Sequence, residues 1–183
     1  MFNVDSGCRA LVLTVLMLSG CASVQAPRTE TAERTTTVFV VRHAEKDPTP
    51  ELKDPPLTEA GQQRAEALRE RLSARPVAAL YTTDTLRTRS TLAPLAAARG
   101  LEPEVYNPRE PAVLASRLRE RHLGQTVVVV GHSNTVLPLI EALGAARPVP
   151  ELSDADYDYL FEVMLRSEGG ATARVHRYGA GPR

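Results

Sequence analysis

Two histidines follow long apolar runs, and this position makes them the residues of the chain best placed to do chemistry. His43 follows one run with only Arg42 between, and His132 comes two residues after Val130, the last of four consecutive valines. Both runs are typical of strands buried on both faces, so both imidazoles should emerge at strand ends. In a sheet covered by helices, ligands bind at the carboxyl ends of the strands. We therefore expect the two histidines to share one site.

Two arginines belong to the same pattern of strand ends. Arg42 precedes His43, and Arg87 lies a few residues beyond the apolar segment 77–81. A guanidinium is a permanently charged, forked donor that suits phosphate oxygens. A neutral imidazole can attack phosphorus and form a covalent intermediate. Because a phosphoryl group in transfer needs fixed cations and an in-line nucleophile, these residue types could carry out that transfer.

Taken singly, each of these side chains has a simpler explanation. A histidine after a strand is more often structural or exposed than catalytic. Arg42 could be a solvated charge, and Arg87 could pair with a carboxylate on a neighbouring helix. The joint placement of both arginines and both histidines at strand exits favours the catalytic interpretation. With only two well-placed histidines and no cysteine cluster, we expect neither a metal site nor a cofactor.

Strands and helices alternate along the part of the chain that must position these residues. Strands are expected over residues 36–41, 77–81, 104–106 and 126–130, and helices from Thr58, over 86–99, from Pro111 and after Ser133 or Asn134. Residues 159–165 and 173–178 then form a C-terminal hairpin. This order predicts the α/β class, as a three-layer α/β/α sandwich whose sheet is mixed but mostly parallel.

The helix after Thr58 has the clearest local signals. Thr58 can cap its first turn, and Glu59 interacts favourably with the helix dipole. One stripe of this helix consists of small and apolar residues: Gly61, Ala65, Leu68 and Leu72. The helix should therefore pack on the sheet through that stripe.

The start of the chain carries signals of export. Residues 10–18 are an apolar stretch that is too short to cross a bilayer as a mature helix and has the length of a signal-peptide core. The Leu-Ser-Gly-Cys string that ends at Cys21 resembles the bacterial lipoprotein cleavage box. The resemblance implies a signal peptide over residues 1–20 and lipidation of Cys21. A secretory signal cut near Ala22 or Ala26 and an uncleaved anchor helix remain as alternatives.

The rest of the chain predicts a tether and one domain. Residues 21–35 lack apolar periodicity and are expected to be a flexible tether, while residues 36–183 have the usual size of a single domain. Cys8 leaves with the signal peptide, so the mature chain has no pair of cysteines for an internal disulfide.

The charge balance and the export signals limit the classes of partner that the protein can be expected to have. The chain has 22 basic and 22 acidic residues, and this balance gives no indication of a nucleic-acid surface. We expect a protein of the bacterial cell envelope that faces the periplasm and is attached to the outer membrane only through its lipid. The expected partner is a small phosphorylated substrate, and the sequence leaves the oligomeric state open.

Four motifs occur in an order that points to a known family. Residues 41–46, 81–91 and 130–135 each begin where a predicted strand ends, and the Leu-Thr-Glu-Ala-Gly string at 57–61 lies between the first two. This order resembles the histidine phosphatase superfamily, which also contains the phosphoglycerate mutases. The family usually has glycine where this chain has Ala44. The resemblance covers about residues 36–144 and implies a phosphoglycerate mutase-like fold of the short, branch-1 type.

The resemblance also implies a role for each site residue. His43 would be the nucleophile that carries the phosphoryl group as phosphohistidine. His132 would be the second imidazole of the pocket and would donate to the phosphoryl oxygens, most effectively when protonated. Arg42, Arg87 and His132 would together hold the phosphoryl group.

Arg89 competes with Arg87 for the place in the site. On a helix these two side chains point about 200° apart, so only one of them can face the pocket. The family pattern of Ser-x-x-x-Arg with threonine four positions later implies Arg87 and Thr91.

The general acid for the leaving oxygen is the part that the sequence leaves open. Relatives have a carboxylate after the third strand, and Asn107 stands about there in this chain. Glu110, at the start of the next helix, is the nearest substitute, and Glu45 comes next. Glu110 could equally be a favourable charge at a helix N-terminus.

The predicted function is that of an exported phosphatase. The resemblance implies hydrolysis of phosphomonoesters through phosphohistidine on His43. One alternative is a phosphotransferase of the phosphoglycerate mutase type, although the chain lacks the insertions of relatives that exclude water. The other is an envelope lipoprotein that binds phosphate or another anion without turnover.

Overall fold

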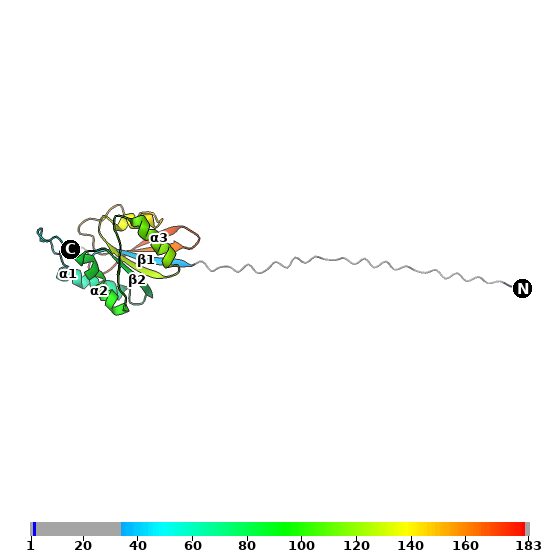
Figure 1. The fold of residues 1–183 in the computed structure, drawn as a ribbon, viewed down its shortest axis with the longest axis horizontal. Helices are drawn as coiled ribbons and strands as arrows, with labels where there is room; N and C mark the ends of the chain where they lie inside the picture. Colours follow the sequence, from blue (N-terminus) through cyan, green and yellow to red (C-terminus); the bar gives the residue numbers. More distant parts are fainter. Residues whose placement is uncertain (1, 3–33, 182–183) are drawn as a thin grey trace. The chain divides into compact units, whose positions relative to one another are not determined.

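One six-stranded sheet organises the computed structural model, which describes residue 2 and residues 34–181. The strands are β1 (Thr35–Arg42), β2 (Val77–Thr82), β3 (Glu104–Val105), β4 (Thr126–Gly131), β5 (Tyr159–Arg166) and β6 (Ala171–Arg177), in the spatial order β3-β2-β4-β1-β5-β6. The helices are α1 (Glu59–Arg71), α2 (Leu86–Arg99), α3 (Pro111–Arg121) and α4 (Val136–Ala142). Figure 1 shows them around the sheet.

The sheet is mixed, as predicted. Strand β4 pairs in parallel with β1 and with β2, and β2 pairs in parallel with the short edge strand β3. Strands β5 and β6 form the predicted C-terminal hairpin, and β5 runs antiparallel to β1. The register places Arg42 opposite Gly131, and the amide of His43 donates to the Gly131 carbonyl at 2.9 Å. The two histidines therefore leave the sheet side by side.

Alternating side chains of the central strands build one core on each face of the sheet. Val38 and Val40 of β1 belong to the core that includes α3 and α4, while Phe39 and Val41 belong to the core under α1 and α2. The valines of β4 divide between the two cores in the same way. Burial of both faces explains the continuous apolar runs in the sequence. The α/β/α sandwich is confirmed.

The helix after β4 begins later than predicted. Neither Ser133 nor Asn134 is its N-cap, since α4 starts at Val136 with Thr135 at the cap position. The amides of Thr135 and Val136 both donate to the His132 carbonyl, and the Thr135 hydroxyl accepts from the His132 amide. These bonds form a tight turn that uses residues 132–135 before the helix can begin. Strand β1 also starts one residue earlier than predicted, at Thr35.

The membrane and export predictions lie largely outside the described residues. Cys21, the signal peptide and most of the tether belong to the part of the chain that the structure does not describe. Among residues 2 and 34–181, no helix has the length and apolar character needed to cross a bilayer.

The N-terminus of α1 holds the loop that follows β1. Thr58 is the N-cap, as predicted, and its hydroxyl accepts from the amide of Gly61 at 3.1 Å. The amide of Thr58 donates to the carbonyl of Glu45 at 2.9 Å. Gly61 lies so close to this carbonyl that a Cβ atom would collide with it. The Leu-Thr-Glu-Ala-Gly motif therefore serves to fix the backbone two residues beyond His43.

This close approach makes Gly61→Ala a destabilising change. Alanine gains up to about 1 kcal/mol over glycine in a helix interior, but backbone overpacking costs about 1–3 kcal/mol. Because the collision is with a carbonyl that is itself hydrogen-bonded, we expect a net loss of roughly 1–2 kcal/mol in the free energy of unfolding. Urea denaturation measures it, with the exposed neighbour Gln62→Ala as control. A Gly61→Ala protein as stable as the wild type would contradict this interpretation.

Candidate active site

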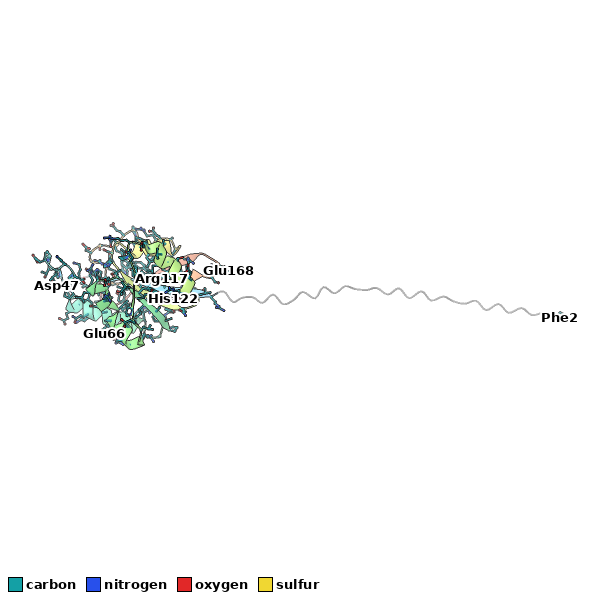
Figure 2. The ribbon with its side chains drawn as sticks, viewed as in Figure 1. Phe2, Asp47, Glu66, Arg117, His122 and Glu168 are labelled. Atoms are coloured by element: carbon teal, nitrogen blue, oxygen red, sulfur yellow. The ribbon has the colours of Figure 1, made fainter. Side chains whose placement is uncertain are left out.

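The four residues predicted to form the site are brought together at the carboxyl end of the sheet. Arg42 is the last residue of β1, His43 and His132 follow β1 and β4, and Arg87 lies in the first turn of α2. The ring centroids of the two histidines are 5.4 Å apart, with an edge-on geometry of 68°. Nη2 of Arg87 is 3.4 Å from Nδ1 of His132. In Figure 2, Asp47, from the loop after His43, lies at the opposite side of the domain from His122 and Glu168.

His43 is held as a neutral imidazole with one free ring nitrogen. The residue is 4% exposed. Nδ1 is 2.8 Å from the carbonyl of Ala44, which can only accept, so this partner assigns the proton to Nδ1 and the lone pair to Nε2. Burial lowers the pKa of His43 to about 3, and the charges of Arg42 and Arg87 add to this effect. At neutral pH, Nε2 is therefore available as a nucleophile.

His132 is also neutral when no anion is bound. Burial lowers its pKa to about 4, with Arg87 and then Arg42 as further causes. Its Nδ1 accepts from Arg87, and its Nε2 contacts the hydroxyl of Thr83 at 2.9 Å. A negative charge beside the ring would favour its protonated form. Thr83 lies directly after β2, at the same sheet edge as the histidines.

Arg42 is buried under the segment before β5. Its Nη1 donates to the carbonyl of Ser153 at 2.7 Å, and its guanidinium lies 4.1 Å from the ring centroid of Tyr157. The carboxylate of Asp154 is 3.5 Å from Nη2. This contact joins positions more than 100 residues apart in the sequence.

Of the two candidate arginines, the structure places Arg87 in the site. Arg89 is 52% exposed and pairs with Asp84, whereas Arg87 is 19% exposed and contacts His132 and Asp54. The Thr91 hydroxyl donates to the carbonyl of Arg87 at 2.7 Å and accepts from the amide of Ala44 at 2.9 Å. Thr91 therefore ties the turn that carries Arg87 to the loop that carries His43.

The two guanidiniums retain donors for a ligand. The Nε atoms of Arg42 and Arg87 are buried, and neither has a hydrogen-bond partner among the described residues. Buried donors of this kind are normally satisfied. A tetrahedral anion between the arginines could accept from them. Among the described residues, no group of three or more His, Cys, Asp or Glu side chains is placed to hold a metal ion.

Three carboxylates near the candidate active site have different partners. The Glu110 carboxylate accepts from the side chain of Asn107 at 2.9 Å. Glu45 forms an ion pair with Arg64. Asp54 contacts Arg87 at 3.2 Å and accepts from the Leu86 amide. Glu110 as the general acid stays a prediction.

Solved structures share this fold. The protein histidine phosphatase SixA complexed with tungstate superposes with a TM-score of 0.64 at 20% identity, over 78% of this chain and 96% of that one. A mycobacterial glucosyl-3-phosphoglycerate phosphatase gives a TM-score of 0.61 at 16% identity, over 81% and 100%. YhfR of Bacillus stearothermophilus gives 0.59 at 22%, over 78% and 96%.

Sequence comparison finds a family profile that matches part of the chain. None of the curated proteins matches the chain significantly. Residues 38–108, which include Arg42, His43 and Arg87, match the profile of the histidine phosphatase superfamily, branch 1. The matched segment is therefore similar to the histidine phosphatase superfamily, branch 1, and the solved structures share the fold of the domain.

Proposed function

We propose that this protein hydrolyses phosphomonoesters through a phosphohistidine intermediate on His43. The observation that carries the proposal is a neutral imidazole beside two buried guanidiniums, and among residues 34–181 neither Nε2 of this imidazole nor the Nε of either arginine has a hydrogen-bond partner. Such a site offers a nucleophile and fixed positive charge to a phosphoryl group.

The reaction would proceed in two displacements. Nε2 of His43 attacks phosphorus while the bond to the leaving oxygen breaks, and that oxygen takes up a proton. Water then attacks the phosphohistidine, so inorganic phosphate leaves and the neutral imidazole is restored. Arg42, Arg87 and His132 stabilise the charge that spreads over the equatorial oxygens. A phosphoryl dianion near His132 would raise the fraction of its ring that is protonated and able to donate.

The substrates to be tested are chosen from the proposed chemistry and from the names of the similar structures. One similar structure is named as a protein histidine phosphatase and another as a glucosyl-3-phosphoglycerate phosphatase. A phosphohistidine peptide and a sugar phosphate therefore belong beside simple aryl and alkyl phosphates. Transfer of phosphate between the positions of a glycerate would instead support the mutase alternative, and binding without turnover would support the lipoprotein alternative.

The cellular address is a further part of the proposal. The Leu-Ser-Gly-Cys string at Cys21 supports a lipoprotein that faces the periplasm from the outer membrane. A tether of residues 21–35 would link the lipid to the domain.

The arginine pair Arg87 and Arg89 offers a matched test of the function. We expect the wild type to hydrolyse 4-nitrophenyl phosphate and Arg87→Ala to lose roughly 10²–10³-fold in kcat/KM, as for loss of one donor to a transition-state oxygen. Arg89→Ala removes the same charge from an exposed position and should stay within about two-fold. Equal losses in the two variants, or full activity in Arg87→Ala, would show that the site is assigned wrongly.

The low pKa of His43 predicts a loss of stability in mild acid. Between pH 6.5 and about 3 the unfolded chain binds a proton at this residue and the folded chain does not, so stability falls as the pH is lowered. From pH 7.5 to pH 5 the contribution of His43 amounts to about 2 kcal/mol. Urea unfolding of wild type and His43→Asn at both pH values measures it. An identical pH dependence in the two proteins would refute the buried, neutral imidazole.

Lipidation makes a simple prediction about location. With Cys21 intact, the full chain expressed in its native type of envelope should fractionate with the outer membrane and incorporate labelled palmitate. Cys21→Ser should abolish both properties without changing the phosphatase activity of the domain. Retention of the Cys21→Ser protein in the membrane fraction would instead favour an uncleaved anchor helix.

A further inference from the structure

The peptide between Ala44 and Glu45 decides which nitrogen of His43 is free. Its carbonyl, that of Ala44, lies 2.8 Å from Nδ1 of His43. If this peptide rotated, Nδ1 would lose its acceptor and the ring could place its proton on Nε2, the nitrogen needed for attack. Whatever holds the Ala44–Glu45 peptide therefore acts on the nucleophile.

The two peptides that flank it, before Ala44 and after Glu45, are each held by a helix. The amide of Ala44 donates to Thr91 of α2 at 2.9 Å. On the other side, Thr58 and Gly61 of the α1 N-terminus hold the carbonyl of Glu45, by a hydrogen bond and by close packing.

The side chain of Glu45 is held by a buried arginine. Arg64 of α1 is 5% exposed, and its Nε and Nη2 donate to the two carboxylate oxygens of Glu45 at 2.8–3.0 Å. This is the forked geometry that fixes both position and orientation. Arg64 occupies the sheet-facing stripe predicted for α1, between Gly61 and Ala65, where a charge is costly unless it is paired.

The remaining donors of Arg64 bind the C-terminal segment. Nη1 donates to the carbonyl of Tyr178 at 2.9 Å, and Nη2 donates to that of Ala180 at 2.8 Å. Arg64 thus joins the segment after β6 to the loop after β1. With both oxygens of Glu45 engaged in this way, the geometry describes a fixed ion pair rather than a proton donor to substrate.

We propose that Arg64 and Glu45 form a positioning pair that orients the Ala44–Glu45 peptide so that His43 presents a free Nε2 to substrate. The inference rests on the proposed function, in that it takes His43 as the nucleophile. It reassigns Glu45 from a candidate acid to a positioning residue. The support of the nucleophile then extends from α1 to the C-terminal segment.

The test compares Arg64→Ala, Glu45→Ala and the double variant in the full domain. A matched control is Arg69→Ala, because Arg69 lies on the same helix in an exposed ion pair with Glu66. The rate of phosphohistidine formation is measured well below the unfolding temperature of each variant, with 4-nitrophenyl phosphate and with an alkyl phosphate. The inhibition constant of inorganic phosphate is measured in parallel.

A positioning pair predicts three results. Each single variant should slow phosphoryl transfer by roughly 10–100-fold, the scale expected for a displaced catalytic group, and the double variant should be no slower than either. The loss should be the same for both leaving groups, because a low-pKa nitrophenolate needs no acid. The phosphate inhibition constant and the Arg69→Ala control should stay within about two-fold of the wild type.

Other outcomes would overturn the inference. Unchanged rates in folded variants would show that the pair is only structural, additive losses would show that its members act separately, and a larger loss with the alkyl phosphate would make Glu45 the acid. If Arg64→Ala fails to fold, Glu45→Gln replaces it, with ¹⁵N NMR of the histidine rings as the readout. We expect the Nδ1-protonated form of His43 in the wild type and a mixture in Glu45→Gln, and an unaltered ring would refute the proposal.

A failure of this inference can be distinguished from a failure of the proposed function, because the NMR comparison does not depend on turnover. A wild type that never forms phosphohistidine would end the proposed function. The dependence of the His43 tautomer on Glu45 would still be decided by the NMR comparison.

Discussion

The parallel register between β1 and β4 is the constraint on which the rest of the structure depends. It sets Arg42 opposite Gly131, so the chain leaves both strands at the same level and His43 stands beside His132. A slip of one residue would turn every valine of β1 to the other face of the sheet. The two cores therefore fix the register, and the register fixes the distance between the imidazoles. The geometry of the candidate site is therefore a consequence of hydrophobic packing.

Burial also sets the electrostatics of the site. Two guanidiniums and two imidazoles are crowded together, and desolvation with mutual repulsion keeps both rings neutral. In the proposed reaction, neutrality lets His43 act as the nucleophile, while the arginines keep a permanent charge for the phosphoryl oxygens. Asp54 and Asp154 each pair with one arginine and balance part of this charge. The remaining positive charge of the two guanidiniums suits the site to binding an anion such as a phosphoryl group.

Local signals in the sequence predicted the strands and helices well, and they predicted poorly the contacts that hold the site residues in place. The apolar runs before His43 and His132, the cap at Thr58 and the span of α2 depend on nearby residues, and the structure confirms them. The contact between Arg42 and Tyr157 joins distant parts of the chain, and hydrophobic periodicity does not reveal it. The late start of α4 results from a turn that periodicity does not reveal either. Arg64 is visible in the sequence as a charged residue on a helix face of small and apolar residues. Its role could be inferred only once the structure showed that it binds Glu45.

The most direct test of the account is to locate the phosphoryl group during turnover. The enzyme is mixed with excess substrate, quenched in alkali within milliseconds, digested and examined by mass spectrometry. The account predicts phosphohistidine at His43, lost on acid treatment and absent from His43→Ala. Turnover in which the phosphoryl group is found only on His132, or on no residue at all, would contradict it.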